Sequence, residues 1–278
     1  MVHPDKHLTL GHIRYLNCVP FFGALAEQGF QGRLIPGVPS ELNRMLHQGH
    51  LDASPSSSFE YARNWRDYLL LPGHSVSSTG RIASVLLFSP VPPEQLEGHA
   101  IAITGESATS INLLRILLKE FYRCYDVTDY VPDATVESQL AQRKPALLIG
   151  DRALRTAQNC PEGIQIYDLG ELWYQHTELP FVFALWMVRK EVLPIFTQEL
   201  DQLGYQLQAS CDYVLKNCDY YAAAAGETIE LPIQQIIDYW RTIDYRLDEQ
   251  HQRGFLLFVQ LCVEYGLLNE VPELNFFN

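Results

Sequence analysis

Three short polar segments hold the side chains best suited to bind or transform a small molecule. They are Arg14-Tyr15-Leu16-Asn17, Ser54-Pro55-Ser56-Ser57-Ser58 and Gly105-Glu106-Ser107-Ala108-Thr109-Ser110. Each follows a predicted strand, and open α/β sheets bind their ligands at the ends of strands. Hydroxyl, amide and backbone N–H groups donate hydrogen bonds to carboxylates. We therefore expect these segments to hold a small anionic metabolite in a cleft.

The first two segments also have purely structural interpretations. Asn17 either presents its amide to a ligand or caps the helix that follows. The run of Ser56, Ser57 and Ser58 either caps a helix or forms a carboxylate cradle at the helix N-terminus. No histidine accompanies these serines at nucleophile-activating spacing, so a serine hydrolase is not favoured.

The third segment favours ligand contact over capping alone. A glycine, then serine and threonine, then the apolar helix Ile111–Phe121 is an arrangement in which the helix dipole and unpaired N–H groups bind an anion. The segment is not a P-loop, because it lacks Gly-Lys-Ser/Thr. The GxGxxG pattern is absent from the sequence, so a dinucleotide site has no support.

Other positions carry weaker signals. Gly150-Asp151 ends a predicted buried strand, where Asp151 suits either ligand contact or a helix cap. Ser84 lies inside an apolar strand, so its hydroxyl needs a hydrogen-bond partner. His47 and His50 have no third ligand nearby, and no metal site is predicted.

Short apolar runs alternate with helical patterns, which is typical of βαβ units around a mostly parallel sheet. Strands are predicted at Leu8–Ile13, Arg33–Pro36, Leu51–Ser54, Arg81–Ser89, Ala100–Thr104, Thr128–Val131, Ala146–Gly150, Gln165–Leu169 and Phe181–Arg189. Helices are predicted at Pro20–Gln28, Pro39–His47, Thr109–Phe121 and Val136–Gln142, with a mostly helical remainder, Leu193–Asn278, that includes Phe255–Tyr265.

The length of the chain suits two lobes. At 278 residues it accommodates two units of about 100–150 residues each. Pro90, Pro92 and Pro93 stop one strand and suit a crossover between lobes, and the apolar run Phe181–Arg189 returns the chain. We therefore expect an α/β clamp with a cleft, two crossover segments and a helical C-terminal region. The predicted lobes are residues 1–89 plus 184–278, and residues 90–183.

Composition and charge narrow the class of partner. Hydrophobic residues make up 47% and charged residues 19%, which is ordinary for a globular protein with a large core. The formal net charge of −13 repels nucleic acid and anionic lipid, so neither partner is expected. The six cysteines form no CxxC pair and are expected to be reduced thiols. Neither an apolar stretch of about 20 residues nor an export signal is evident, so a cytoplasmic location is expected.

Taken together, these motifs resemble the chorismate dehydratases of the futalosine route to menaquinone. The match runs in order from about Gly11 to Arg189, and beyond it only the general helical character agrees. The matching pieces are Arg14-Tyr15-Leu16-Asn17 with Pro20, Gly37-Val38-Pro39 with Leu42-Asn43, Leu51-Asp52, Ser56–Ala62, Gly80–Leu87, Thr104–Ser110, Ala146–Asp151, Asp168-Leu169-Gly170 with Trp173, and Thr177–Trp186.

The resemblance implies a fold, a reaction and a set of site residues. The implied fold is that of type II periplasmic binding proteins. The implied enzyme is a carbon–oxygen lyase that converts chorismate to 3-[(1-carboxyvinyl)oxy]benzoate and water without a cofactor. Asn17 and Ser84 are carried over to the reaction centre. The positions carried over to substrate binding are Arg14, Tyr15, Ser56, Ser57, Ser107, Ala108, Thr109, Gly150 and Asp151.

Two other functions remain open from the sequence. One is a non-catalytic solute-binding protein for a small anion, because a fold does not fix a function. The other is dihydroxynaphthoate synthase, which has the same fold and acts in the same pathway. The serine run and the Arg14–Asn17 loop favour the dehydratase. The oligomeric state stays open.

Overall fold

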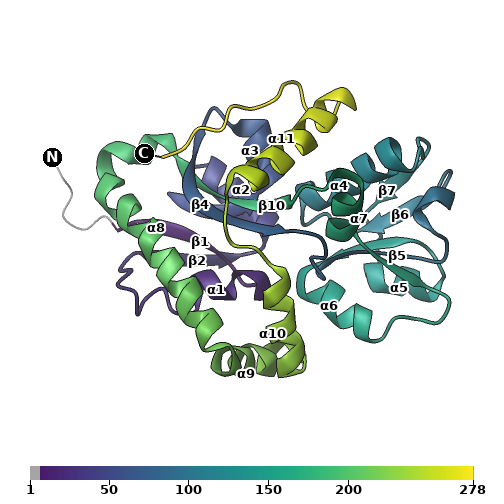
Figure 1. Cartoon of the computed structure of the whole chain (residues 1–278), viewed down its shortest axis with the longest axis horizontal. Helices are drawn as coiled ribbons and strands as arrows, with labels where there is room; N and C mark the ends of the chain where they lie inside the picture. The colour runs from purple at the N-terminus through teal and green to yellow at the C-terminus, as the bar shows by residue number, and fades with distance from the viewer. Residues whose placement is uncertain (1–6, 278) are drawn as a thin grey trace.

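The computed structural model describes residues 7–277 and shows two β-sheets with helices packed around them (Figure 1). The first sheet contains β1 (Thr9–Ile13), β2 (Arg33–Gly37), β3 (Ala53–Ser57), β4 (Tyr68–Ser78) and β10 (Phe181–Arg189), in the order β2-β1-β3-β10-β4. The second contains β5 (Val85–Ser89), β6 (Ala100–Ile103), β7 (Thr128–Tyr130), β8 (Ala146–Ile149) and β9 (Gln165–Asp168), in the order β7-β6-β8-β5-β9. Residues 1–6 and 278 of the predicted lobes lie outside the described residues.

The helices divide between the two lobes. Those of the first lobe are α1 (Val19–Phe22), α2 (Pro39–His47), α3 (Ser58–Asn64), α8 (Leu193–Lys216), α9 (Cys218–Ile229), α10 (Ile233–Thr242) and α11 (Glu249–Glu264). Those of the second are α4 (Ala108–Ile116, continued by a π-helical turn to Phe121), α5 (Val136–Ala141), α6 (Gly150–Gln158) and α7 (Leu169–Thr177). The local sequence explains why α2 forms. Pro39 suits the first turn of a helix, and Leu42 and Leu46 form an apolar face that is buried.

Both sheets are mixed, whereas a mostly parallel sheet was expected. In the first, β1 runs parallel to β2 and β3, while β10 is antiparallel to β3 and β4. In the second, β6 runs parallel to β7 and β8, while β5 is antiparallel to β8 and β9. The reversed strands are those with which the chain enters the second sheet and re-enters the first. Neither belongs to a βαβ unit of its own sheet, so neither has to run parallel.

The crossovers fall at other positions than the sequence suggests. The expected strand Arg81–Ser89 is confined to β5, which pairs with β8 and β9 and therefore lies in the second sheet. The whole of β10 lies in the first sheet. A proline cluster marks the end of a strand but does not say which sheet the strand joins. We therefore propose connecting segments at residues 79–84 and 178–180, in place of boundaries at 89 and 183.

Strand β4 is the largest element that the sequence pattern misses. It contains Pro72, Gly73 and several serines instead of an apolar run. It forms because β10 pairs along one of its edges, while Asp244 and Phe276 bridge to Ser77 and Leu70 on the other. A proline is tolerated in a strand at such an edge. The strand is thus a product of long-range pairing.

Several other bounds also differ from expectation. Helices α6 and α7 were not expected, and the helix predicted at Pro20–Gln28 is limited to α1. Helix α11 begins at Glu249, so it is longer than the predicted Phe255–Tyr265. Strand β3 extends through Ser56 and Ser57, so these serines belong to the strand and do not follow it as a separate segment.

One aromatic cluster joins the two lobes. Trp173 of α7 packs edge-on against Phe181 of β10, with 5.2 Å between ring centroids, and against Phe258 of α11, at 6.3 Å. Gly254 of α11 lies against the carbonyl oxygen of Pro180, where an added Cβ would come within 2.0 Å. The C-terminal helix therefore packs on the connection between the lobes.

Among the described helices, none combines the length and the apolar composition that a membrane span requires.

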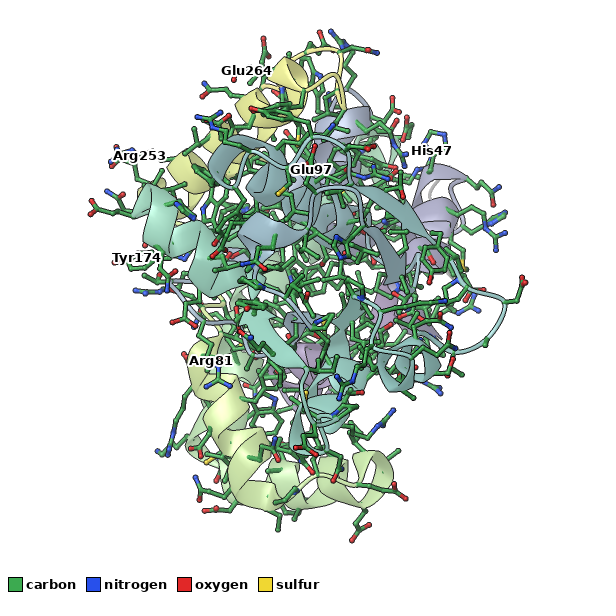
Figure 2. The ribbon with its side chains drawn as sticks, turned by 90° about the vertical axis from the view of Figure 1, so that its right-hand side faces the viewer. His47, Arg81, Glu97, Tyr174, Arg253 and Glu264 are labelled. Atoms are coloured by element: carbon green, nitrogen blue, oxygen red, sulfur yellow. The ribbon has the colours of Figure 1, made fainter. Side chains whose placement is uncertain are left out.

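Charged and polar side chains such as His47, Glu97, Arg253 and Glu264 lie at the outer surface (Figure 2). His251 of α11 differs, because its side chain is 3% exposed. Its Nδ1 lies 2.8 Å from an oxygen of Asp248, and its Nε2 lies 3.3 Å from an oxygen of Asp244. Asp244 also pairs with Arg246 and bridges to β4. The cluster ties the C-terminal segment to the first sheet.

Replacing His251 with glutamine should destabilise the protein in a pH-dependent way. Burial opposes protonation, but Asp244 and Asp248 raise the pKa of His251. Because the folded pKa exceeds the unfolded value of about 6.5, this stabilisation is complete below about pH 6.5 and is lost as the pH rises through the folded pKa. We expect a loss of about 1.5–3 kcal/mol near pH 6 and a smaller one near pH 9, measured by urea unfolding. The exposed His50→Gln is the control, and an equal loss at both pH values would contradict the ion-pair explanation.

Candidate active site

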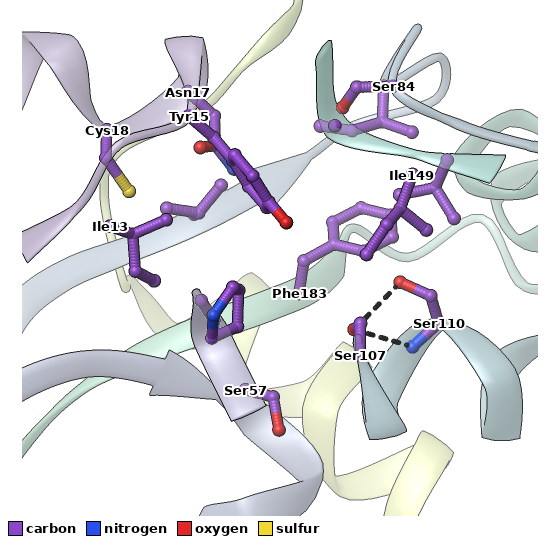
Figure 3. Close-up of a pocket in the computed structure, with 16 residues that line it drawn as sticks. Ile13, Tyr15, Asn17, Cys18, Ser57, Ser84, Ser107, Ser110, Ile149 and Phe183 are labelled. Carbon is purple, nitrogen blue, oxygen red and sulfur yellow. Dashed lines mark hydrogen bonds between the residues drawn. The ribbon is translucent and has the colours of Figure 1, made fainter. Parts of the chain in front are cut away.

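A cavity lies between the two lobes, with residues of both sheets in its walls (Figure 3). It encloses about 590 Å³ between the atoms, part of it open to solvent. Ile13, Val76 and Phe183 of the first sheet and Val85 and Ile149 of the second form much of its apolar surface. The polar side chains in its walls are Tyr15, Asn17, Ser57, Ser84, Ser107 and Ser110. Mostly apolar walls with a few polar groups are typical of a small-molecule site.

Six of the residues carried over to the site line this cavity, and five do not. The six are Tyr15, Asn17, Ser57, Ser84, Ser107 and Gly150. The five are Arg14, Ser56, Ala108, Thr109 and Asp151. Ser110, which lies one helical turn beyond Ser107, belongs to the third polar segment but was not among the positions carried over, and the apolar walls have no local sequence signal.

The five other residues have structural surroundings of their own. Arg14 is exposed, whereas Ser56 is fully buried within β3. Thr109 accepts a hydrogen bond from the backbone N–H of Phe59 at 3.0 Å. Asp151 accepts one from the N–H of Leu16 at 3.1 Å, and burial raises its pKa. Ala108 is the first residue of α4, next to the cavity-lining Ser107. Thr109 and Asp151 thus hold neighbouring segments of the cavity walls through hydrogen bonds.

Asn17 stands in a short 3-10 turn that is held on both sides. The preceding residue, Leu16, donates from its N–H to Asp151. The carbonyl of Leu16 accepts a hydrogen bond from Trp240 Nε1 at 2.8 Å. The residue that precedes α1 is Cys18, so Asn17 is not the helix cap. The Oδ1 atom of Asn17 is buried and has no hydrogen-bond partner among the described residues. Because an unpaired buried carbonyl is costly, Oδ1 is positioned to accept a hydrogen bond from a ligand, while the Nδ2 group of the same amide is the donor.

Ser84 lies in the connection between the lobes, on a constrained backbone. The preceding Ala83 has a φ of 63°, in the left-handed region that a residue with a Cβ rarely adopts. Asp168 holds this conformation by accepting hydrogen bonds from the N–H groups of Ile82 and Ala83 at 3.1 and 2.6 Å. The Ser84 carbonyl accepts a bond from the N–H of Gly150 at 2.8 Å. The position of Ser84 is therefore set by the second lobe.

Ser57 and Ser107 are both helix caps and cavity walls. Ser57 accepts a hydrogen bond from the N–H of Glu60 at 3.3 Å, and Ser107 accepts one from the N–H of Ser110 at the same distance. The hydroxyl groups of Ser107 and Ser110 lie 3.1 Å apart (Figure 3). A hydroxyl has two lone pairs and a proton, so capping does not prevent it from donating to a ligand. At Ser57 and Ser107 capping is confirmed, and ligand contact stays a prediction that is compatible with it.

The lobes touch directly around the cavity. The Tyr15 hydroxyl donates to Glu106 Oε2 at 3.1 Å, and the Tyr15 ring packs on Gly150, where a Cβ would lie 3.2 Å from it. Burial and the Glu106 carboxylate raise the pKa of Tyr15, so its phenol remains a donor. Ser58 and Thr109 join the lobes further along, with 3.3 Å between their hydroxyl oxygens.

The residues that line the cavity all belong to the described part of the chain. They include no lysine, arginine, histidine, aspartate or glutamate. Burial raises the pKa of the Cys18 thiol, and Asp151 raises it further, so this group is not an anion at neutral pH. The serine hydroxyl groups and the Asn17 amide in these walls can donate hydrogen bonds to a carboxylate. The walls offer donors for an anion but no basic side chain.

Sequence comparison finds relatives along most of the chain. Residues 8–264 match the protein family described as menaquinone biosynthesis. A chorismate dehydratase from Thermus thermophilus is 38% identical over 200 residues, which cover 67% of this chain and 71% of that protein. A chorismate dehydratase from Campylobacter jejuni is 25% identical over 273 residues, which cover 94% of this chain and 100% of that protein.

Solved structures with the same architecture include binding proteins. A protein from Archaeoglobus fulgidus gives a TM-score of 0.73 at 17% identity, over 96% of this chain and 100% of its own. The periplasmic aliphatic sulphonate-binding protein of Escherichia coli gives 0.71 at 14% identity, over 98% of this chain and 92% of its own. At such identities the likeness concerns the fold alone. It confirms the predicted two-lobed periplasmic-binding-protein fold.

Proposed function

The chain belongs to the menaquinone biosynthesis family, and from that premise we propose that it is a chorismate dehydratase. In this proposal it is a carbon–oxygen lyase that converts chorismate to 3-[(1-carboxyvinyl)oxy]benzoate and water. The observation that carries the proposal is the cavity lining, which supplies hydroxyl and amide donors for a dianion but no side-chain base. Such a site suits a reaction whose base comes from the substrate.

The reaction balances without an oxidant. The proton on ring carbon C3 and the hydroxyl on C4 leave, and the electron pair of the C3–H bond becomes the new π bond between C3 and C4. The proton and the departing hydroxide make the released water, and the product ring is aromatic. Since C3 is γ to the ring carboxylate through a double bond, negative charge developing at C3 is delocalised toward that carboxylate. Donors fixed on the carboxylate stabilise this charge.

We assign the proton acceptor to the enolpyruvyl carboxylate of the substrate, with Asn17 orienting it. The hydroxyl groups of Ser57, Ser107 and Ser110 and the first N–H groups of α4 would hold the ring carboxylate. Enclosure between two lobes excludes water and keeps the carboxylate close to C3, so positioning supplies much of the rate acceleration.

Incubation with chorismate tests the proposal directly. We expect purified protein to remove the diene absorbance of chorismate and to yield a product lighter by one water, identified by mass spectrometry. Chorismate that binds and is recovered unchanged would instead support a solute-binding protein, the function of several proteins with this fold. Absence of both binding and turnover would reject the substrate.

We also propose that the protein acts in the cytoplasm. Its six cysteines all lie within the described residues and are free thiols, as expected in a reducing compartment. A biosynthetic family is consistent with this location. Fractionation of cells with an antibody against the protein tests it, and recovery from the periplasmic fraction would reject it.

A further inference from the structure

Helix α10 contacts both segments that carry the proposed reaction-centre residues. Trp240 donates to the carbonyl of Leu16, the residue before Asn17, over 2.8 Å. Its neighbour Tyr239 donates from its hydroxyl to Ser84 Oγ, also over 2.8 Å. Figure 1 shows α10 at the base of the first lobe, on the side that faces α6 of the second. Two adjacent residues of one helix thus hold two segments that are far apart in the sequence.

The Tyr239 hydroxyl fixes the direction in which the Ser84 hydroxyl points. Both side chains are buried, each residue being 3% exposed. Burial raises the pKa of Tyr239, so its phenol stays protonated and serves as the donor. Because Tyr239 occupies one lone pair of Ser84 Oγ, the Ser84 proton is directed to a different acceptor. Ser84 lines the cavity, so its proton is available to a ligand atom there.

We propose that Tyr239 is a positioning residue for the dehydration, which keeps the Ser84 hydroxyl aimed as a donor at a substrate oxygen that gains negative charge in the transition state. The inference rests on the proposed function. A hydroxyl that accepts one hydrogen bond becomes a stronger donor in the next, so Tyr239 also polarises Ser84. Through this contact the helical C-terminal region takes part in building the active site.

The substitution Tyr239→Phe tests this role, because it removes one oxygen and keeps the ring. We expect kcat with chorismate to fall roughly tenfold while KM changes by less than about twofold, since the lost interaction acts in the transition state. Ser84→Ala should lower kcat at least as much. In the double variant Tyr239→Phe should cost nothing further, because Tyr239 acts only through Ser84. A purely structural role of Tyr239 would lower kcat in both backgrounds.

Tyr68→Phe is the matched control. Tyr68 is 1% exposed, its hydroxyl has no hydrogen-bond partner among the described residues, and it does not line the cavity. Its substitution should leave kcat and KM at the wild-type values. Additive losses in the Ser84→Ala background, or wild-type kcat in Tyr239→Phe, would overturn the inference while leaving the dehydratase proposal intact. A wild-type protein without turnover would reject the dehydratase proposal itself.

Thermal unfolding of each variant shows whether the fold survives at the assay temperature. Should Tyr239→Phe not remain folded, 3-fluorotyrosine placed at position 239 replaces it, since its more acidic hydroxyl is a stronger donor. The inference then expects a changed kcat at constant KM when Ser84 is present and no change when Ser84 is alanine. An unchanged kcat in the presence of Ser84 would overturn it.

Discussion

Replacing Asn17 with leucine should lower kcat with chorismate by about 10²–10³-fold, the loss typical for removal of one preorganised polar group from a transition state. Leucine has the same number and branching of side-chain heavy atoms as asparagine but cannot orient a carboxylate. The buried Oδ1 of Asn17 has no protein partner, so its removal should not lower the melting temperature. A large loss of turnover in a protein of undiminished stability is therefore expected, measured by steady-state kinetics and thermal unfolding.

Asn159→Leu is the control for this substitution. Asn159 is exposed at the C-terminal end of α6 and does not line the cavity, so its replacement should leave kcat unchanged. Near-normal turnover of Asn17→Leu would exclude the role assigned to Asn17. A loss of turnover accompanied by a drop in melting temperature would show that Asn17 acts through the fold.

Replacing Asp168 with alanine should reduce both stability and turnover. Its carboxylate caps α7 through the N–H groups of Gly170 and Glu171 and holds those of Ile82 and Ala83 on the way to Ser84. Alanine leaves these donors without their acceptor in a site where Asp168 itself is only 7% exposed. We expect a loss of about 3–5 kcal/mol in the free energy of unfolding, measured in urea. Because Ala83 would no longer be held at positive φ, we also expect kcat to fall at least about tenfold.

Asp168→Asn separates the two effects. Asparagine keeps one acceptor oxygen and is a good helix cap, so α7 should stay capped and the loss of stability should be small. In the wild-type protein Oδ2 of Asp168 accepts a hydrogen bond from the N–H of Ala83. In the variant the NH₂ group of asparagine takes the place of Oδ2, so two donors face each other there. We expect kcat to remain low while the unfolding midpoint recovers. Full recovery of both would show that the carboxylate serves only as a helix cap.

Much of the local structure was predictable from the sequence. The helix Pro39–His47 and the strand Phe181–Arg189 have the predicted bounds, because their apolar residues follow the period of the element and their ends carry clear signals. The polar segments at Arg14–Asn17 and Gly105–Ser110 also follow strands as predicted, whereas most of the Ser54–Ser58 segment lies within β3. The two-lobed α/β fold and the family also followed from sequence motifs.

The sequence could not assign strands to sheets or polar groups to partners. Strand β5 has an apolar pattern that either lobe could use, and its pairing with β8 and β9 decides the matter. Strand β4 carries a proline, a glycine and serines, and forms only because segments from far along the chain pair with it. Neither the sheet that β5 joins nor the formation of β4 can be predicted from residues that are neighbours in the sequence.

The amino-acid sequence by itself determined where turns, caps and apolar faces occur, because these depend on residues within a few positions of each other. The tertiary structure alone decided which polar groups are satisfied by the protein and which are left for a ligand. Ser84 is bound by a tyrosine 155 positions away and Leu16 by a tryptophan 224 positions away, while Oδ1 of Asn17 has no partner among the described residues. Hydrogen bonding in a buried site is settled by contacts between distant segments, and these exist only once the lobes are packed together.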